Sequence, residues 1–192
     1  MIDSDLHSLL FSFIPSKSQG IDSIRVSDLR RNYEVIKHVL LHMLNGFITS
    51  CIIPDELKTA IVRPLFKGGA GSKIENYRPI SVLPIIAQLL ENHVFHTMTS
   101  FLDVHNVISP SQFGFVQGKG TQPLLEDFAD LLFSGFEGRL VSCALFLDVS
   151  KAFDTVSHSI LLKKLYSYGF RGPFIFISFQ LPFKSLTTCN SR

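Results

Sequence analysis

The sequence predicts one α+β domain, because stretches with helical spacing of apolar residues alternate with short runs rich in β-forming residues. The helical spacing occurs within residues 28–50, 85–105 and 121–132. The strand candidates are residues 59–66, 77–83 and 140–147. The chain has 192 residues, of which 46% are hydrophobic, enough for one sizeable core. No internal repeat, low-complexity tract or linker interrupts it, so we expect a single folding unit.

The first helix is predicted within the N-terminal third. Residues before Gly20 show little pattern beyond a short apolar patch, Leu9–Ile14. The range Asp28–Ser50 then carries apolar residues three and four positions apart, which is typical of an amphipathic helix. These residues are Ile36, Val39, Leu40, Met43, Leu44 and Phe47. Pro54 follows and marks the end of the helix.

A β-hairpin is predicted next. Thr59–Phe66 is rich in β-forming residues, and residues 68–71, Gly-Gly-Ala-Gly, favour a turn. Tyr77–Leu83 can pair with the first strand across that turn. Because Pro79 has no amide hydrogen to donate, we expect the second strand at an edge or a bulge of the sheet.

Three further helices are predicted after the hairpin. Ile85–His105 has one apolar stripe, made of Ile86, Leu90, Val94, Met98 and Phe101. Thr121 is expected to cap the next helix. The inward residues of that helix are expected to be Leu124, Leu125, Phe128, Leu131 and Leu132. The last helix, Ile160–Tyr168, is expected to end at Gly169.

Asp148 is the most informative single residue. It follows the apolar run 140–147, which is typical of a strand buried on both faces of a sheet. We therefore predict Leu140–Asp148 as a central strand. An unpaired carboxylate removed from water costs several kcal/mol, so Asp148 requires a cationic partner, and a metal ion is the usual one. The alternative is that Asp148 caps the turn after the strand and that Lys151 neutralises it.

Composition limits the partners and the compartment. Only 18% of residues are charged, below the roughly 25% of typical soluble domains, so part of the surface is expected to be covered by further sequence or by nucleic acid. A net charge of +2 is too small to indicate a nucleic-acid partner. A local group of cations is more informative, and it comprises Lys58, Arg63, Lys67, Lys73 and Arg78.

Cysteine use and hydropathy indicate an intracellular protein of the cytoplasm or nucleus. The three cysteines are far apart and no CxxC pair occurs, so we expect free thiols in a reducing compartment. The acidic N-terminus does not resemble a secretory signal. No apolar run approaches the ~18 residues of a membrane span.

Several motifs occur in a fixed order. Residues 63–69 read Arg-Pro-Leu-Phe-Lys-Gly-Gly, and residues 76–81 read Asn-Tyr-Arg-Pro-Ile-Ser. Residues 109–115 read Ser-Pro-Ser-Gln-Phe-Gly-Phe, and residues 146–156 read Phe-Leu-Asp-Val-Ser-Lys-Ala-Phe-Asp-Thr-Val. In order and spacing, these motifs resemble the reverse transcriptases of non-LTR (LINE-type) retrotransposons over about Gly20–Arg171. The resemblance implies a partial right-hand polymerase, with fingers and the first palm strand.

The resemblance implies roles for the residues around Asp148. Polymerases of this family use two magnesium ions for nucleotidyl transfer. Asp148 matches the first metal-binding aspartate, and the carbonyl of Val149 would be a second ligand. Phe153 matches the aromatic residue beneath the sugar, whose ring favours deoxynucleotides. The alternative for Phe153 is an ordinary core aromatic.

The resemblance also implies contacts to substrates. Lys67 and Arg78 match the family's triphosphate contacts, and we expect them on one basic surface facing the side where Asp148 emerges. The alternative is that they are solvated surface charges. Gln112, Gly114 and Phe115 would lie near the template. After Gly-Phe the family usually has a basic residue, whereas this chain has Val116.

The expected function is therefore a reverse transcriptase fragment, an RNA-directed DNA polymerase that requires Mg²⁺. Its partners would be an RNA template, a DNA primer and deoxynucleoside triphosphates, with no membrane and no protein partner indicated. The aromatic-Ala-Asp-Asp motif with the later catalytic aspartates does not occur, so the chain alone is expected to be inactive. The alternative is a non-catalytic nucleic-acid-binding remnant. Residues 1–19 are expected as a leader, 20–171 as the family region and 172–192 as an atypical tail.

Overall fold

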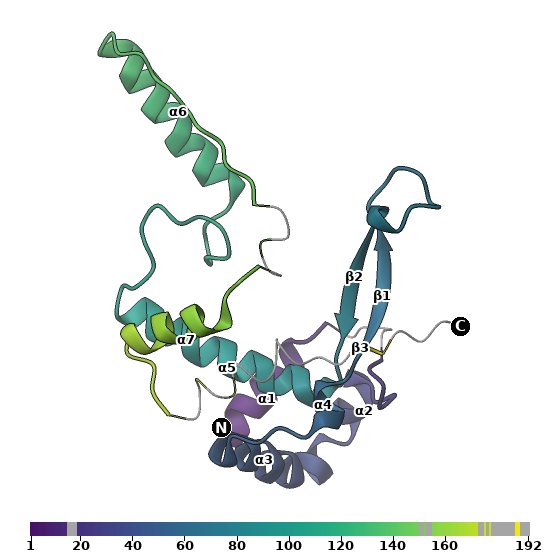
Figure 1. The fold of residues 1–192 in the computed structure, drawn as a ribbon. Helices are drawn as coiled ribbons and strands as arrows, with labels where there is room; N and C mark the ends of the chain where they lie inside the picture. Colours follow the sequence, from purple (N-terminus) through teal and green to yellow (C-terminus); the bar gives the residue numbers. More distant parts are fainter. Residues whose placement is uncertain are drawn as a thin grey trace. The chain divides into compact units, whose positions relative to one another are not determined.

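Helices and strands both occur, which confirms the predicted mixture of the two (Figure 1). The computed structural model describes residues 1–14, 19–149, 152, 155–172, 175, 177 and 187–188. These residues fall into two units, and each is described by itself. The first comprises Met1–Thr99 with His158–Arg192, and the second comprises Ser100–Ser157. In the part of the chain that is described, no helix is both long and apolar enough to cross a membrane.

Helices build the core of the first unit. Most of the buried core residues come from α1 (Asp3–Ser12), α2 (Val26–Arg31), α3 (Tyr33–Ser50) and the first part of α5 (Ile85–Val104). The unit also contains α4 (Asp55–Lys58) and α7 (His158–Ser167), which contribute no buried apolar residue to this core. Fully buried leucines from three of these helices meet in one cluster, among them Leu6, Leu10, Leu44, Leu89 and Leu90. Each such side chain stabilises the fold by about 1.5–3 kcal/mol relative to its exposed state. The predictions of α5 and of α7, which ends before Gly169, are confirmed.

Helix α1 was not predicted, since its apolar residues form only a short stripe. Its helicity depends on packing, because Leu6, Leu9 and Leu10 are buried in the cluster. Arg30 of α2 satisfies carbonyl groups at the end of α1, which have no partner within the helix. Its Nε donates to the Leu10 carbonyl at 3.1 Å and its Nη2 to the Phe11 carbonyl at 3.0 Å.

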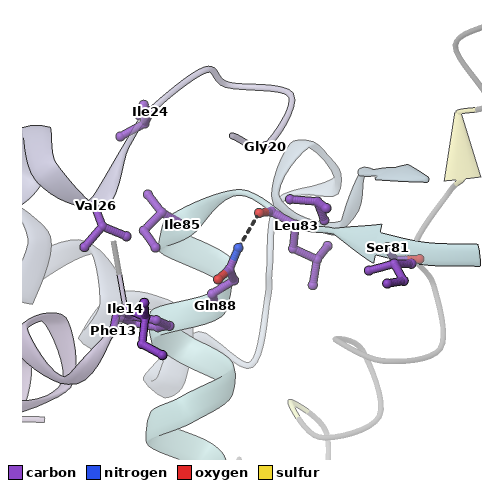
Figure 2. A pocket seen from close by; sticks show the side chains of 11 residues that line it. Phe13, Ile14, Gly20, Ile24, Val26, Ser81, Leu83, Ile85 and Gln88 are labelled. Atoms are coloured by element: carbon purple, nitrogen blue, oxygen red, sulfur yellow. Dashed lines mark hydrogen bonds between the residues drawn. The ribbon is translucent and has the colours of Figure 1, made fainter. Parts of the chain in front are cut away.

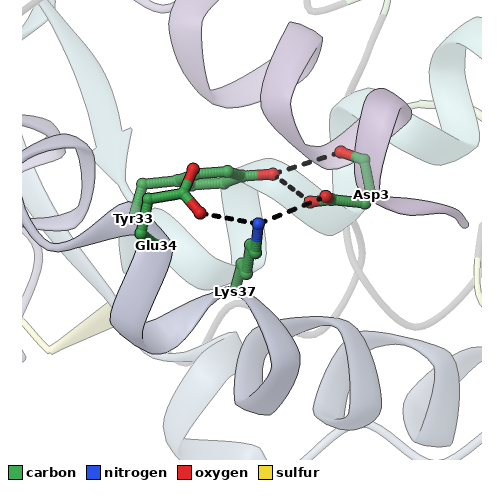
Figure 3. Close-up of polar contacts among 4 residues, drawn as sticks. All are labelled: Asp3, Tyr33, Glu34 and Lys37. Carbon is green, nitrogen blue, oxygen red and sulfur yellow. Dashed lines mark hydrogen bonds and ion pairs between the residues drawn. The ribbon is translucent and has the colours of Figure 1, made fainter.

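A polar network joins the start of α1 to α3 (Figure 3). The Tyr33 hydroxyl donates to Asp3 Oδ1 at 2.5 Å, and Lys37 Nζ lies 2.7 Å from Glu34 Oε2 and 3.6 Å from Asp3 Oδ2. The hydrogen bond from Tyr33 lowers the pKa of Asp3, whereas burial raises the pKa of Tyr33. Tyr33 therefore stays neutral and donates to an ionised Asp3 at neutral pH.

The helical structure predicted within Asp28–Ser50 is confirmed, but it belongs to two helices that are separated at Asn32. The backbone there has φ −104° and ψ 13°, outside the helical region, so α2 ends and α3 begins. The Asn32 side chain donates from Nδ2 to the Asp28 carbonyl at 2.9 Å. This local bond competes with the helix ladder, which is why asparagine favours such breaks.

The predicted hairpin is confirmed. Strands β1 (Ala60–Phe66) and β2 (Tyr77–Val82) pair antiparallel, from Ile61 opposite Val82 to Phe66 opposite Tyr77. The two-residue β3 (Thr187–Thr188) pairs parallel with β1, so the strand order is β2-β1-β3 and β2 is an edge strand. The expectation that Pro79 lies on an edge strand is therefore confirmed.

The hairpin begins beside the helical core. A cavity of about 340 Å³ lies at this place, and Figure 2 shows the side chains that line it, which come from the chain before α2, the start of α2, the end of β2 and the start of α5. Gln88 Nε2 donates to the Leu83 carbonyl at 2.7 Å and joins α5 to the chain that leaves β2. Gly20 packs so closely that a Cβ there would lie 2.7 Å from Pro84 Cα. Only glycine fits this approach.

The second unit contains the end of α5, a loop, α6 (Thr121–Glu137) and the residues after α6. The prediction that Thr121 caps α6 is wrong, because Gly120 is the N-cap and Thr121 is the first helical residue. The predicted inward face is wrong in part. Phe128 and Leu132 are half-buried, but Leu124, Leu125 and Leu131 are exposed.

The prediction that Leu140–Asp148 forms a central strand is wrong. These residues have neither strand nor helical structure and are exposed. The chain turns after α6, where the Leu140 amide donates to the Gly135 carbonyl at 2.8 Å. It then runs back beside the helix, with the Phe128 and Phe146 ring centroids 6.1 Å apart. A strand exists only with a neighbour in its ladder, and no described segment pairs with this one.

Two glycines test the packing at the foot of the hairpin. We expect Gly20→Ala to lower the free energy of unfolding by about 1–3 kcal/mol, because its Cβ would overlap the Pro84 backbone. Gly46→Ala, within α3, is the matched control, because a Cβ added at Gly46 would meet no neighbouring group within 4 Å. It should stabilise by about 0.5–1 kcal/mol, since alanine favours helix. Urea unfolding of both variants measures this, and a Gly20→Ala chain as stable as the parent would contradict it.

Candidate functional site

The β1–β2 pairing decides which side chains share a face. Side chains alternate along a strand, and directly paired residues lie on the same face. Leu65 is opposite Arg78 and Arg63 is opposite Ile80, so both arginines share one face. The Lys67 amide donates to the Asn76 carbonyl at 2.7 Å, which extends the ladder by one pair. Lys67 is therefore on the same face as Arg63 and Arg78.

These three residues form what we call the basic face: Arg63, Lys67 and Arg78. Arg78 lies diagonally between the other two, and diagonal neighbours in a sheet are about 7–8 Å apart. All three are exposed, and none forms an ion pair with any residue that the structure describes. Between Ala60 and Leu83 the one carboxylate is Glu75, against four cations. The basic face thus carries unbalanced positive charge.

The other two cations of the predicted group lie elsewhere. Lys58 is buried, and its Nζ pairs with Asp55 Oδ1 at 2.9 Å. Lys73 belongs to the tip of the hairpin, just before the short helix η1 (Ile74–Asn76), and its amide donates to the Ala70 carbonyl at 3.1 Å. The expected cluster of five is therefore three residues on one face of the hairpin, one residue at its tip, and one buried lysine that pairs with an exposed aspartate.

Hydrogen bonds hold the tip against the strands. Asn76 Nδ2 donates to the Ala70 carbonyl at 2.8 Å, and the Tyr77 hydroxyl donates to the Gly71 carbonyl at 3.0 Å. Gly68 and Gly69 have φ of 116° and 96°, which side chains with a Cβ rarely adopt. The Gly-Gly turn and these two bonds therefore fix where β1 ends and β2 begins.

The opposite face of the hairpin is apolar. The Phe66 and Tyr77 rings pack with centroids 5.3 Å apart. A groove of about 680 Å³ lies on this side, lined by Val62, Pro64, Gly71, Ser72, Ile74, Tyr77 and Pro79. The three cations therefore lie on one face of the hairpin and the apolar groove lies on the other, because side chains alternate along a strand.

The predicted template-proximal residues lie in the loop before α6. Gln112 Nε2 donates to the Gly114 carbonyl at 3.3 Å, and Phe115 is exposed with φ 60°. A cation is present despite Val116, because Lys119 Nζ lies 5.1 Å from the centroid of the Phe113 ring and also donates to the Pro110 carbonyl. A contact between Gln112, Gly114 or Phe115 and a template stays a prediction.

Asp148 and Val149 are both exposed. Asp148 has no ion pair or hydrogen bond with any residue that is described, and the described ranges contain no group of three or more His, Cys, Asp or Glu residues able to hold a metal ion. These residues therefore do not fit a two-metal site by themselves. Lys151 and Phe153 lie outside the described residues, so the structure says nothing of their expected roles.

Comparison with known proteins places the chain in a family. Residues 67–190 match the sequence profile of the reverse transcriptase (RNA-dependent DNA polymerase) family, and that match covers more than half of the chain. The chain therefore belongs to the reverse transcriptase family. The expected resemblance to the enzymes of non-LTR retrotransposons is confirmed by the relatives.

Three relatives illustrate this similarity. A probable RNA-directed DNA polymerase from transposon BS of Drosophila melanogaster is 27% identical over 78% of this chain and 17% of its own length. The RNA-directed DNA polymerase from mobile element jockey of the same species is 26% identical over 83% of this chain and 18% of its own. The Pol polyprotein from element R2 of Popillia japonica is 29% identical over 78% and 20%. The chain spans about a fifth of these relatives.

Sequence reasoning paired Lys67 with Arg78 but left Arg63 in a general basic group. The missing information was the register. Arg63 and Lys67 are four positions apart, and an even separation within a strand places both side chains on one face. The even separation of Arg63 and Lys67 becomes informative only when the regular strand pairing is known to continue as far as Lys67.

The exposed residues after α6 lead to a prediction about dye binding. Leu145 and Leu147 are 82% and 83% exposed, so the isolated chain should bind a hydrophobic dye such as anilinonaphthalene sulfonate and be poorly soluble. We expect Leu145→Asp with Leu147→Asp to lower the dye fluorescence by about half and to improve solubility. Val35→Asp, at an exposed apolar residue of α3, is the control and should change both little. A soluble parent chain that binds no dye would contradict this prediction.

Proposed function

We propose that this chain forms the fingers and the first palm segment of a retrotransposon reverse transcriptase. In this proposal the basic face binds the triphosphate of an incoming deoxynucleotide through Lys67 and Arg78. The observation that carries it is that both cations are exposed on one face of a regular hairpin, with no ion pair in the described part of the chain. Membership of the family supports the same assignment.

The chemistry of the two residues suits a phosphate ligand. Hydrogen bonds between cations and phosphate oxygens are about twice as strong as neutral ones, and a guanidinium can donate two in parallel. Lys67 would act as a compact charge and Arg78 as a planar fork. Neither has to break an ion pair with a described residue before it binds.

The other site residues are proposed from their motif positions. Asp148 and the Val149 carbonyl would hold Mg²⁺, Phe153 would select deoxynucleotides, and Gln112, Gly114 and Phe115 would lie near an RNA template paired with a DNA primer. One carboxylate cannot hold two magnesium ions tightly, so further carboxylates from outside the described residues would have to complete the centre. Mg²⁺ would neutralise charge on the phosphates during nucleotidyl transfer.

A second candidate is a non-catalytic nucleic-acid-binding protein. The basic face favours it equally, because unpaired cations bind any phosphate chain. The two candidates differ in whether Asp148 takes part in synthesis.

Triphosphate binding tests the proposed role of the basic face. We expect Lys67→Ala with Arg78→Ala to weaken binding of a fluorescent deoxyadenosine triphosphate analogue by about tenfold or more, because two charged hydrogen bonds are lost. Lys73→Ala removes the same type of charge from the hairpin tip and should change the affinity little. Titration followed by fluorescence measures both. Equal affinity of the double variant and the parent chain would remove the assignment.

Primer extension tests whether the chain is active by itself. We expect no synthesis by the isolated chain on a primed RNA template with Mg²⁺, because the described residues do not form a metal centre. Gel analysis of an end-labelled primer measures this. Template-dependent extension that disappears in Asp148→Asn would contradict the prediction and establish the chain as an active polymerase.

A further inference from the structure

We infer that Arg63 makes the basic face a binding track for the sugar-phosphate backbone of a single nucleic-acid strand, longer than a triphosphate alone would need. This inference deepens the proposed function and rests on it, because it uses the same face of the hairpin. Three features carry it: the length of the cationic row, the residues between the cations, and the rigidity of the pairing beneath them.

The row is longer than one triphosphate. Arg63 and Lys67 are four residues apart on one strand, or about 13 Å at about 3.3 Å per residue. Phosphates of a stacked strand follow each other at about 3.4 Å along its axis, so the row spans about four of them. The three phosphates of a nucleotide are joined directly through bridging oxygens and occupy a shorter length. Arg63 therefore lies where a strand, but not one triphosphate bound at Lys67, would continue.

Apolar side chains alternate with the cations. Leu65 is opposite Arg78 and is 53% exposed, and Ile80 is opposite Arg63 and is 44% exposed. On this face, cationic and apolar side chains therefore alternate both along each strand and across the strand pair. A nucleic-acid strand presents the same mixture, with phosphates on one side and sugar and base surfaces beside them. The triphosphate group of a deoxynucleotide has no apolar part, and only one sugar and one base accompany it, whereas a strand carries a sugar and a base for every phosphate.

The pairing holds the cations at fixed spacing. Along an antiparallel ladder, pairs that exchange hydrogen bonds alternate with pairs that do not. Lys67 and Asn76 form a hydrogen-bonded pair, so Pro64 and Pro79, three positions further along, form a pair without hydrogen bonds. Neither proline therefore costs a bond between β1 and β2. The ladder is regular from Ile61 to Lys67, and three mutually repelling cations are kept close together on it. A polyanion relieves that repulsion.

The test compares an RNA strand with a triphosphate on the full chain. A fluorescein-labelled, unstructured 20-nucleotide RNA is titrated by anisotropy at several salt concentrations, and the fluorescent deoxyadenosine triphosphate analogue is titrated in parallel. We expect Arg63→Ala to weaken RNA binding about three- to tenfold. It should also lower the slope of log K against log salt by about 0.7, the value for one phosphate contact on a single strand. Triphosphate affinity should stay unchanged, and Lys73→Ala should leave both affinities near the parent values.

The outcomes are distinct. An Arg63→Ala chain that keeps the parent RNA affinity and salt slope overturns the inference. Equal weakening of RNA and triphosphate also overturns it, because Arg63 would then belong to the triphosphate site. If Arg63→Ala weakens RNA while Lys67→Ala with Arg78→Ala leaves triphosphate binding intact, the inference stands and the proposed function fails. Arg63→Lys controls for folding: it should restore the slope, and a slope that stays low overturns the role of charge.

Discussion

The antiparallel pairing of β1 with β2 is the constraint on which the candidate site depends. A slip of one residue would move every side chain of one strand to the other face. The bond from the Lys67 amide to the Asn76 carbonyl and the tip bond from Asn76 to Ala70 hold the register at one end. At the other end, the strands leave the helical core through buried Ala60 and through Pro84, against which Gly20 packs. The core thus fixes the foot of the hairpin and the turn fixes its tip.

Described residues hold the hairpin in place, but they do not hold the segment that carries Asp148. Each ladder position of β2 has a partner in β1, so Arg78 is held in place without any other element. Asp148 follows an exposed segment with no strand neighbour, so nothing described holds its carboxylate in place. The described residues therefore hold the cations of the basic face in place, whereas the proposed catalytic residue depends on residues outside the described ranges.

Sequence patterns predicted the elements whose stability is local. The hairpin is an example, because Gly68 and Gly69 mark its turn. Sequence patterns failed for elements whose formation depends on contacts with residues far away in the sequence. Helix α1 forms because Leu6 and Leu10 are buried by other helices, and the strand ending at Asp148 does not form because a ladder requires a partner. The pair of Lys67 and Arg78 was predicted by family resemblance, whereas the place of Arg63 required the observed register.

Site-specific photo-crosslinking tests the two-faced hairpin most directly. Leu65 and Phe66 are neighbours with similar exposure, 53% and 48%, yet they lie on opposite faces. A photoreactive p-benzoylphenylalanine replaces one or the other residue, and the chain is irradiated with labelled single-stranded RNA. The register predicts strong crosslinks from position 65, beside Arg78, and few from position 66. Equal crosslinking from both positions, or crosslinking mainly from 66, would contradict the account.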